Sequence, residues 1–105
     1  PRHLIEYPAN ENLLSVAGVW EAAIKTGTGK LTLAGTVGKF FSHHLSPNGI
    51  SLLPIELRHA AQVATLSSHH RGPFDRLLVA QSLDEDISLI SQENVLDAYG
   101  IDRRW

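Results

Sequence analysis

Asp75 stands near the start of what reads as a helix, within the stretch from Ser68 to Ser91. Gly72 can cap this helix and Pro73 can be its first residue, where a missing N–H does no harm. Asp75 then falls in the first turn, where unpaired backbone N–H groups favour an anion. α/β folds place their chemistry at such points, near the ends of strands. The acid also has a plain explanation, since it stabilises a helix by about 0.3–1 kcal/mol.

Two more acids have the same double interpretation. Glu21 and Lys25 lie one turn apart beside an apolar helical stripe, which also fits an exposed ion pair worth roughly 0.2–0.5 kcal/mol. Glu93 lies in the first turn of a short helix, where an acid is favourable for its own sake. Ser91 can hydrogen-bond a ligand carboxylate or a bound water, and capping that helix is at least as good an interpretation.

Three other patterns are weaker. Gly29-Lys30 invites a phosphate-loop interpretation, but that motif needs glycine at Ile24 and a hydroxyl residue at Leu31. A nucleophile site built on Ser68 has no supporting elbow motif. Adjacent side chains on a helix or strand diverge, so His43-His44 is better explained as a solvated face than as a chelating pair.

The composition fits one globular domain. The chain has 105 residues, of which 43% are hydrophobic and 19% charged. With no cysteine, a disulfide scaffold and a cysteine zinc site are excluded. No apolar run reaches the length of a membrane span and there is no signal-peptide pattern, so we expect a cytoplasmic protein. The net charge of −2 argues against non-specific coating of nucleic acid, but not against a nuclease whose acids bind a metal.

Hydrophobic periodicity predicts strands that alternate with helices, which implies a mostly parallel α/β sheet with three layers. The expected strands cover 13–16, 50–55 and 87–90, with 101–105 as a candidate edge strand. The expected helices cover 2–7, a segment from Ser15 or Gly18 to 27, 36–45, 56–66, a segment from Pro73, and 93–99. Most of the helix from Pro73 should be buried. The helix over 56–66 should bury its apolar residues, which are Leu57, Ala60, Ala61, Val63 and Ala64.

The segment His69–Ser82 carries a resemblance. It reads His-His-Arg-Gly-Pro-Phe-Asp-Arg-Leu-Leu-Val-Ala-Gln-Ser and resembles the signature segment of PIN-domain ribonucleases of the VapC toxin type. Gly72 stands where that family usually has Asp, a position that does not bind the metal. The run around Glu21 is similar to the family's second acidic position, and Ser91-Gln92-Glu93 to its fourth, usually Thr-x-Asp. The similarity extends from about Leu13 to Trp105.

The resemblance implies a metal site and a reaction. It places Glu21, Asp75 and Glu93 around one ion as catalytic and metal-binding residues. Oxygen ligands without cysteine suit Mg²⁺ or Mn²⁺, which can also take phosphate oxygens. The family uses the ion to hydrolyse RNA, leaving a 3′-hydroxyl and a 5′-phosphate. Lys25 and Arg76 are the better candidates for contacts to RNA phosphate, and Arg71 could make one from its loop.

The resemblance also implies a fold and partners. It indicates one PIN-like three-layer α/β/α domain over residues 1–105, truncated at its N-terminus and lacking the family's first strand and leading Asp. That strand would lie between 13–16 and 87–90, so two sheet edges would be left open. Each unpaired buried group costs on the order of 1–3 kcal/mol, and a domain has only about 5–15 kcal/mol of stability. We therefore expect a homodimer, with segments exchanged between copies as one form of it.

Two function classes follow. The first is a metal-dependent endoribonuclease toxin held inactive by a cognate antitoxin. The second is a catalytically inactive PIN remnant that acts as a protein-binding module. A small nucleotide-binding module would need a Gly-rich loop, which the sequence lacks. An antitoxin groove would be lined by Phe40, Phe41, Leu45 and Trp20, although ordinary core packing explains the same residues, Trp20 above all.

Overall fold

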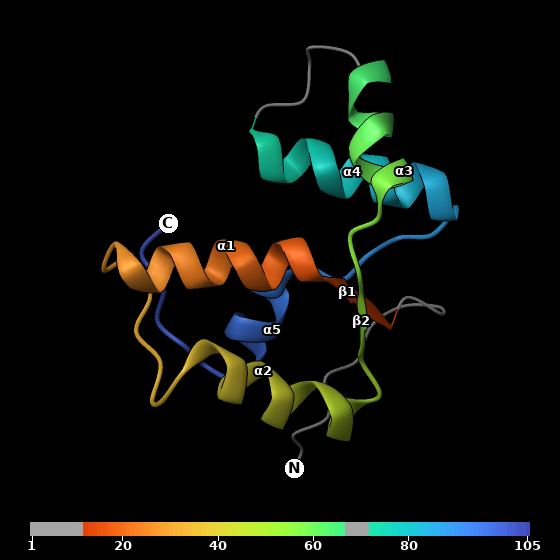
Figure 1. The fold of residues 1–105 in the computed structure, drawn as a ribbon. Coiled ribbons are helices and arrows are strands. Elements are labelled where there is room, and N and C mark those ends of the chain that lie inside the picture. The colour runs from red at the N-terminus through yellow and green to blue at the C-terminus, as the bar shows by residue number, and fades with distance from the viewer. Residues whose placement is uncertain (1–11, 67–71) are drawn as a thin grey trace.

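The sheet of this protein is short and parallel. The computed structural model describes residues 12–66 and 72–105. Strand β1 (Leu13–Ser15) pairs in parallel with β2 (Ser51–Leu53), in the register Leu14 to Leu52. On its other side, Leu14 forms a parallel bridge with Ile90. The predicted α/β class with parallel pairing is therefore confirmed (Figure 1).

Five α-helices surround these strands in the described ranges. They are α1 (Val16–Gly27), α2 (Val37–Leu45), α3 (Leu57–Gln62), α4 (Pro73–Glu85) and α5 (Gln92–Ala98). Two 3₁₀ turns extend α2 and α3, namely η1 (Ser46–Asn48) and η2 (Val63–Thr65). Figure 1 shows α1, α2 and α5 gathered on one part of the molecule, with α3 and α4 crossing each other on another.

The helices begin where local side chains can satisfy their first N–H groups. The hydroxyls of Ser15, Thr36 and Ser91 accept hydrogen bonds from the second or third residue of α1, α2 and α5, at 3.0–3.1 Å. Gly72 precedes α4 with Pro73 as the first helical residue, as the sequence predicts. Each of the three hydroxyl caps satisfies an N–H group that the helix itself leaves unpaired.

The apolar core lies among the strands, α1, α2 and α5. Its buried members are Leu14, Ala22, Leu31, Phe40, Phe41, Leu45, Ile50, Ile90, Val95 and Leu96. The rings of Phe40 and Phe41 meet edge to face with centroids 5.1 Å apart. Phe40, Phe41 and Leu45 are thus core residues, whereas Trp20, expected in the core, is 55% exposed.

Two burial predictions are wrong. In α3 the fully buried side chain is His59, while Leu57 on the predicted core face is 86% exposed. In α4 only Ala80 and Gln81 are buried. The cause is a polar one: α3 and α4 are joined through charged and hydrogen-bonding side chains, so His59, and not Leu57, takes the buried position between them.

Two strand predictions are also only partly met. The segment 87–90 contributes a single bridge at Ile90, and 101–105 contributes an antiparallel bridge between Arg103 and Leu31. The expected open gap in the sheet is not formed, because the Ile90 N–H donates to the Leu13 carbonyl at 2.9 Å. The two inner segments meet directly at this one bridge, so the gap behind the homodimer prediction is closed between Leu14 and Ile90. The homodimer itself stays a prediction. The predicted helix at 2–7 lies outside the described residues.

Candidate functional site

Glu21 and Glu93 lie where α1 meets the start of α5. The Gln92 amide donates a hydrogen bond from Nε2 to Oε1 of Glu21 at 2.5 Å. Gln92 itself is only 2% exposed. The next residue, Glu93, accepts a hydrogen bond through Oε2 from the indole N–H of Trp105 at 2.9 Å. Two of the three predicted acids are therefore held by neutral donors at one helix junction.

Gly18 makes room for this arrangement. A Cβ on Gly18 would lie 3.2 Å from Oε1 and 3.4 Å from Cβ of Gln92. The distance to Oε1 is tighter than ordinary van der Waals contact, so any larger residue would push on the Gln92 side chain. The close approach of α1 and α5 is what lets Gln92 reach Glu21.

Lys25 contacts a ring instead of an acid. Its Nζ lies 5.0 Å from the centroid of the Trp105 ring, within the range of a cation–π interaction. The Glu21–Lys25 ion pair that the helical spacing allows is not formed, although both residues belong to the part of the chain that the structure describes. The plain interpretation of Glu21 as half of an exposed pair is therefore not supported.

Arg103 ties the C-terminal segment to α5. It donates from Nε and Nη2 to the two carboxylate oxygens of Asp97 at 2.9 and 3.1 Å. These hydrogen bonds raise the pKa of Arg103 and lower the pKa of Asp97. Arg103 also donates to the main-chain oxygen of Trp105 at 2.7 Å, and its Cζ lies 5.3 Å from that ring's centroid. The indole that bonds Glu93 is thus anchored from its own segment.

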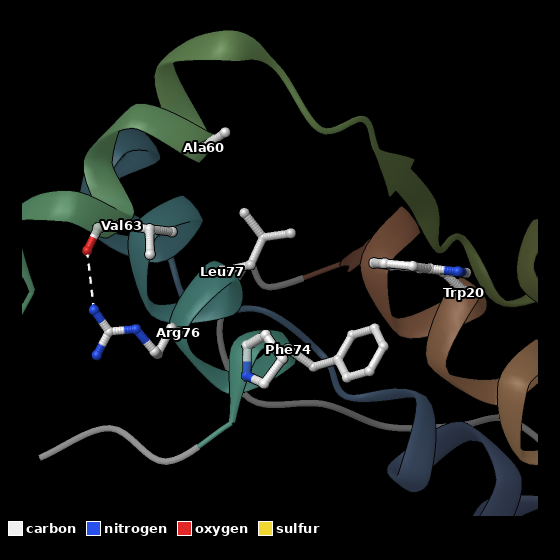
Figure 2. Close-up of a pocket in the computed structure, with 7 residues that line it drawn as sticks. Trp20, Ala60, Val63, Phe74, Arg76 and Leu77 are labelled. Atoms are coloured by element: carbon white, nitrogen blue, oxygen red, sulfur yellow. Dashed lines mark hydrogen bonds between the residues drawn. The ribbon is translucent and has the colours of Figure 1, made fainter. Parts of the chain in front are cut away.

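Asp75 lies on the first turn of α4 and is exposed. The preceding residue, Phe74, meets Trp20 edge to face with ring centroids 4.9 Å apart. Because Trp20 and Phe74 directly precede Glu21 and Asp75, this contact brings the segments that carry the two acids together. Figure 2 shows the two rings facing each other from α1 and α4.

An apolar hollow of about 430 Å³ adjoins these rings. Its lining residues are Trp20, Ala60, Val63, Pro73, Phe74, Arg76 and Leu77 (Figure 2). Arg76 donates from Nη2 to the Val63 carbonyl at 3.2 Å, which holds its guanidinium against η2. Of the predicted RNA contacts, Arg76 therefore lines this hollow and Lys25 lies at Trp105, while Arg71 falls outside the described residues.

The structure brings together the segments that carry the three predicted metal ligands, but the ligand atoms themselves do not form one cluster. Within residues 12–66 and 72–105, only His59, Asp84 and Glu85 have potential ligand atoms that all lie within 4.8 Å of one another. Glu21 and Glu93 each use one carboxylate oxygen in the bonds described above, and no described hydrogen bond engages the other oxygen. Two such oxygens suit a hard cation. The role of Glu21, Asp75 and Glu93 as ligands stays a prediction.

The His59 cluster is satisfied by the protein itself. Nδ1 of His59 accepts the Glu56 backbone N–H at 3.0 Å, so Nε2 carries the hydrogen and donates it to Glu85 at 2.8 Å. A metal on Nε2 would need the opposite tautomer, whose Nδ1–H would face that backbone N–H. Arg58 occupies Asp84 and Glu85 at 2.5 Å each. We therefore assign the cluster to the joint between α3 and α4.

The α3–α4 joint shifts the pKa values of two of its own residues, Glu85 and Arg58. The hydrogen bond from His59, followed by that from Arg58, holds the pKa of Glu85 below its ordinary value of 4.5. The two carboxylates in turn raise the pKa of Arg58. Sequence reasoning missed this joint because its partners lie on different helices, although a histidine three residues after Glu56 fits the capping box that begins α3.

Gln92 and Trp105 were likewise missed as partners of the acids. Their bonds to Glu21 and Glu93 span 71 and 12 residues of the chain, so no local pattern indicates them. Ser91 is confirmed in one of its two interpretations, since it caps α5 through the Asn94 N–H at 3.0 Å.

Comparison with known proteins adds no relative. No protein-family model, no curated protein and no solved structure matches the chain. In the part of the chain that the structure describes, no helix combines the length and the apolar character that crossing a bilayer requires.

Proposed function

We propose that this chain is a PIN-like α/β domain that hydrolyses RNA phosphodiester bonds with a divalent ion, Mg²⁺ or Mn²⁺, in the manner of VapC-type toxins. Glu21, Asp75 and Glu93 are its proposed ligands. The observation that supports the proposal most is the convergence of their segments: Gln92 joins Glu21 to the start of α5, and the Trp20–Phe74 contact joins α1 to the start of α4. The proposed setting is the cytoplasm.

The chemistry divides between the ion and the chain. A bound divalent ion polarises a phosphodiester and lowers the pKa of its water. The chain holds the carboxylates in place, because neutral donors from Gln92 and Trp105 each fix one oxygen without neutralising the acid. Lys25 and Arg76 lie on the same helices as Glu21 and Asp75 and are the proposed contacts to RNA phosphate.

An RNA-cleavage assay with Mn²⁺ tests this function. Asp75→Asn and Glu21→Gln should each abolish cleavage of single-stranded RNA, with the circular dichroism spectrum unchanged. Asp84→Asn is the matched control, because Asp84 belongs to the α3–α4 joint and not to the proposed site. Cleavage retained by either of the first two variants would remove that residue from the site. Cleavage lost in Asp84→Asn alone would move the site to the joint.

A second candidate is a protein-binding module without catalysis. It is favoured by exposed apolar surface: Leu57, Leu83 and Trp20 are 86%, 58% and 55% exposed. The proposed partners are an antitoxin segment that fills the hollow beside Trp20, or a second copy of the chain. Trp20→Asp should abolish binding of such a partner, and the unmodified chain should cleave no RNA in the presence of Mn²⁺, whereas a pure nuclease domain would cleave RNA and would sediment as a monomer with or without the substitution.

A further inference from the structure

Three cations are held together where the C-terminal segment runs beside the end of α1 (Figure 1). The Lys30 N–H donates to the Lys25 carbonyl at 2.9 Å, and the Arg104 N–H donates to the Lys30 carbonyl at 2.9 Å. Trp105 follows Arg104 and completes the circuit, because the Lys25 Nζ lies 5.0 Å from the centroid of its ring. We call Lys25, Lys30 and Arg104 the cationic cluster. Backbone bonds and one ring contact fix its members as neighbours.

Two members of the cationic cluster lie directly opposite each other. The antiparallel bridge pairs Leu31 with Arg103, so the adjoining positions 30 and 104 also face each other. Side chains alternate along such a segment, and Leu31 belongs to the core. The side chains of Lys30 and Arg104 therefore leave together on the opposite face, where both are exposed. Like charges directly opposite destabilise a strand pair, so this arrangement is unfavourable until an anion joins it.

No acid neutralises the cationic cluster within the described residues. None of the ion pairs formed there includes Lys25, Lys30 or Arg104. Of the acids that precede Arg104 in its own part of the chain, Asp97 is engaged in a separate ion pair, and Asp102 is exposed and forms none. The whole chain carries a net charge of −2, so three unneutralised cations in one place are a local exception. Such a group attracts a ligand with several negative charges.

We propose that the cationic cluster binds the phosphate backbone of single-stranded RNA. This inference deepens the proposed function and rests on it for the identity of the ligand. The cluster adjoins the candidate site, because Trp105 contacts Lys25 with its ring and Glu93 with its N–H. An RNA strand that reaches Glu93 passes Lys25 and continues to Lys30 and Arg104. Contacts of this kind position a strand without reading its sequence, and they need no metal.

Fluorescence anisotropy of a labelled oligouridylate in EDTA measures this binding without cleavage. Lys30→Gln and Arg104→Gln should each weaken binding. Each should also make the plot of log affinity against log salt concentration shallower by about 0.7, the value for one phosphate contact of a single strand. Lys39→Gln is the matched control, because Lys39 is an exposed lysine of α2 outside the cluster. It should change neither the affinity nor the slope.

The urea midpoint separates a phosphate contact from a structural role. The two opposite cations repel each other, so either glutamine substitution should leave the midpoint unchanged or higher while RNA binding weakens. A midpoint that falls in both variants would overturn the proposal, because the cations would then serve the fold. Lys30→Arg keeps the positive charge and should keep the affinity, the slope and the midpoint of the unmodified chain.

The outcomes separate this surface from the proposed function. An unchanged slope in both glutamine variants, or no binding of the oligouridylate by the unmodified chain at low salt, overturns the surface and leaves the function to its own cleavage assay. Binding that depends on the cluster, in a chain that cleaves no RNA with Mn²⁺, supports the surface and overturns the function. If one glutamine variant does not fold, the other decides by the same slope.

Discussion

Gln81→Leu should loosen the hold of α4 on the rest of the molecule. Gln81 is fully buried on α4, and its side chain bonds three other segments. Oε1 accepts the Ser15 hydroxyl at 2.5 Å, and Nε2 donates to the Pro54 carbonyl at 3.2 Å. Nε2 also lies 3.3 Å from Nδ1 of His59. This one amide therefore links the start of α1 and the end of β2 to the α3–α4 pair.

The size of the effect follows from what leucine leaves behind. The Ser15 hydroxyl and the Pro54 carbonyl each lose a partner, while His59 keeps the backbone N–H of Glu56. Two orphaned groups cost roughly 2–6 kcal/mol together, of which the apolar leucine side chain offsets about 1 kcal/mol. The expected net loss of about 1–5 kcal/mol is a large part of the roughly 5–15 kcal/mol that stabilises a domain.

Urea unfolding followed by circular dichroism measures this loss. Gln62→Leu is the matched control, since no described hydrogen bond engages the Gln62 side chain, and it should stay within about 0.5 kcal/mol of the unmodified chain. Combining Gln81→Leu with Ser15→Ala removes the orphaned hydroxyl, so the double variant should lose at least about 0.5 kcal/mol less than the two single losses added. Strict additivity, or a Gln81→Leu loss no larger than the control's, would show that Gln81 does not join these segments.

Three further predictions concern neighbouring features of the fold. Gly18→Ala should weaken Mn²⁺ binding, because its Cβ would meet the buried Gln92 amide at 3.2 Å. The control is Gly38→Ala, whose Cβ meets nothing within 4 Å. It should stabilise the chain by about 0.5–1 kcal/mol in urea unfolding without changing Mn²⁺ binding. The pKa of Glu85 is lowered on folding, so its contribution to stability is present above pH 4.5 and lost as the pH falls through the depressed value. Glu85→Gln should therefore flatten this part of the curve of unfolding free energy against pH. An unchanged curve would show that Glu85 is not held by His59 and Arg58. Phe41→Ala in the core should lower the free energy of unfolding by about 3–5 kcal/mol, whereas Leu57→Ala should change it by less than about 0.5 kcal/mol. Equal losses in the two variants would show that the observed burial is wrong.

The helix starts could be predicted because their causes are local. Ser15, Thr36 and Ser91 each accept an N–H from a residue two or three positions later. Gly72 and Pro73 likewise set the start of α4 through their own backbone geometry. Such signals are contained in four or five consecutive residues, so the sequence alone is sufficient for them.

The buried faces of α3 and α4 could not be predicted, because distant charges decide them. His59 is an unusual choice for a fully buried position and is stable there because Glu85, 26 residues away, accepts its hydrogen. Periodicity favoured Leu57 as the core residue, but no apolar element covers that side of α3 among the described residues. An apolar stripe identifies a face that can be buried, and only the tertiary partner determines whether it is.

Only part of the candidate site could be predicted from the sequence, for the same reason. Resemblance indicated Glu21, Asp75 and Glu93, and the structure brings their segments together through α1, α4 and α5. The residues that hold the acids, Gln92 and Trp105, carry no motif of their own. Their role follows only from the helix junction, where Gly18 lets an amide from α5 approach α1.

The proposed function requires one divalent ion to bind among Glu21, Asp75 and Glu93. Mn²⁺ is paramagnetic and broadens the NMR signals of nearby nuclei, so adding it in small steps to ¹⁵N-labelled protein maps the site directly. The amide signals at positions 21, 75 and 93, together with the Trp105 indole signal, should broaden first and in parallel. Broadening that begins at His59, Asp84 and Glu85, or uniform broadening with no preferred site, would contradict the proposed function.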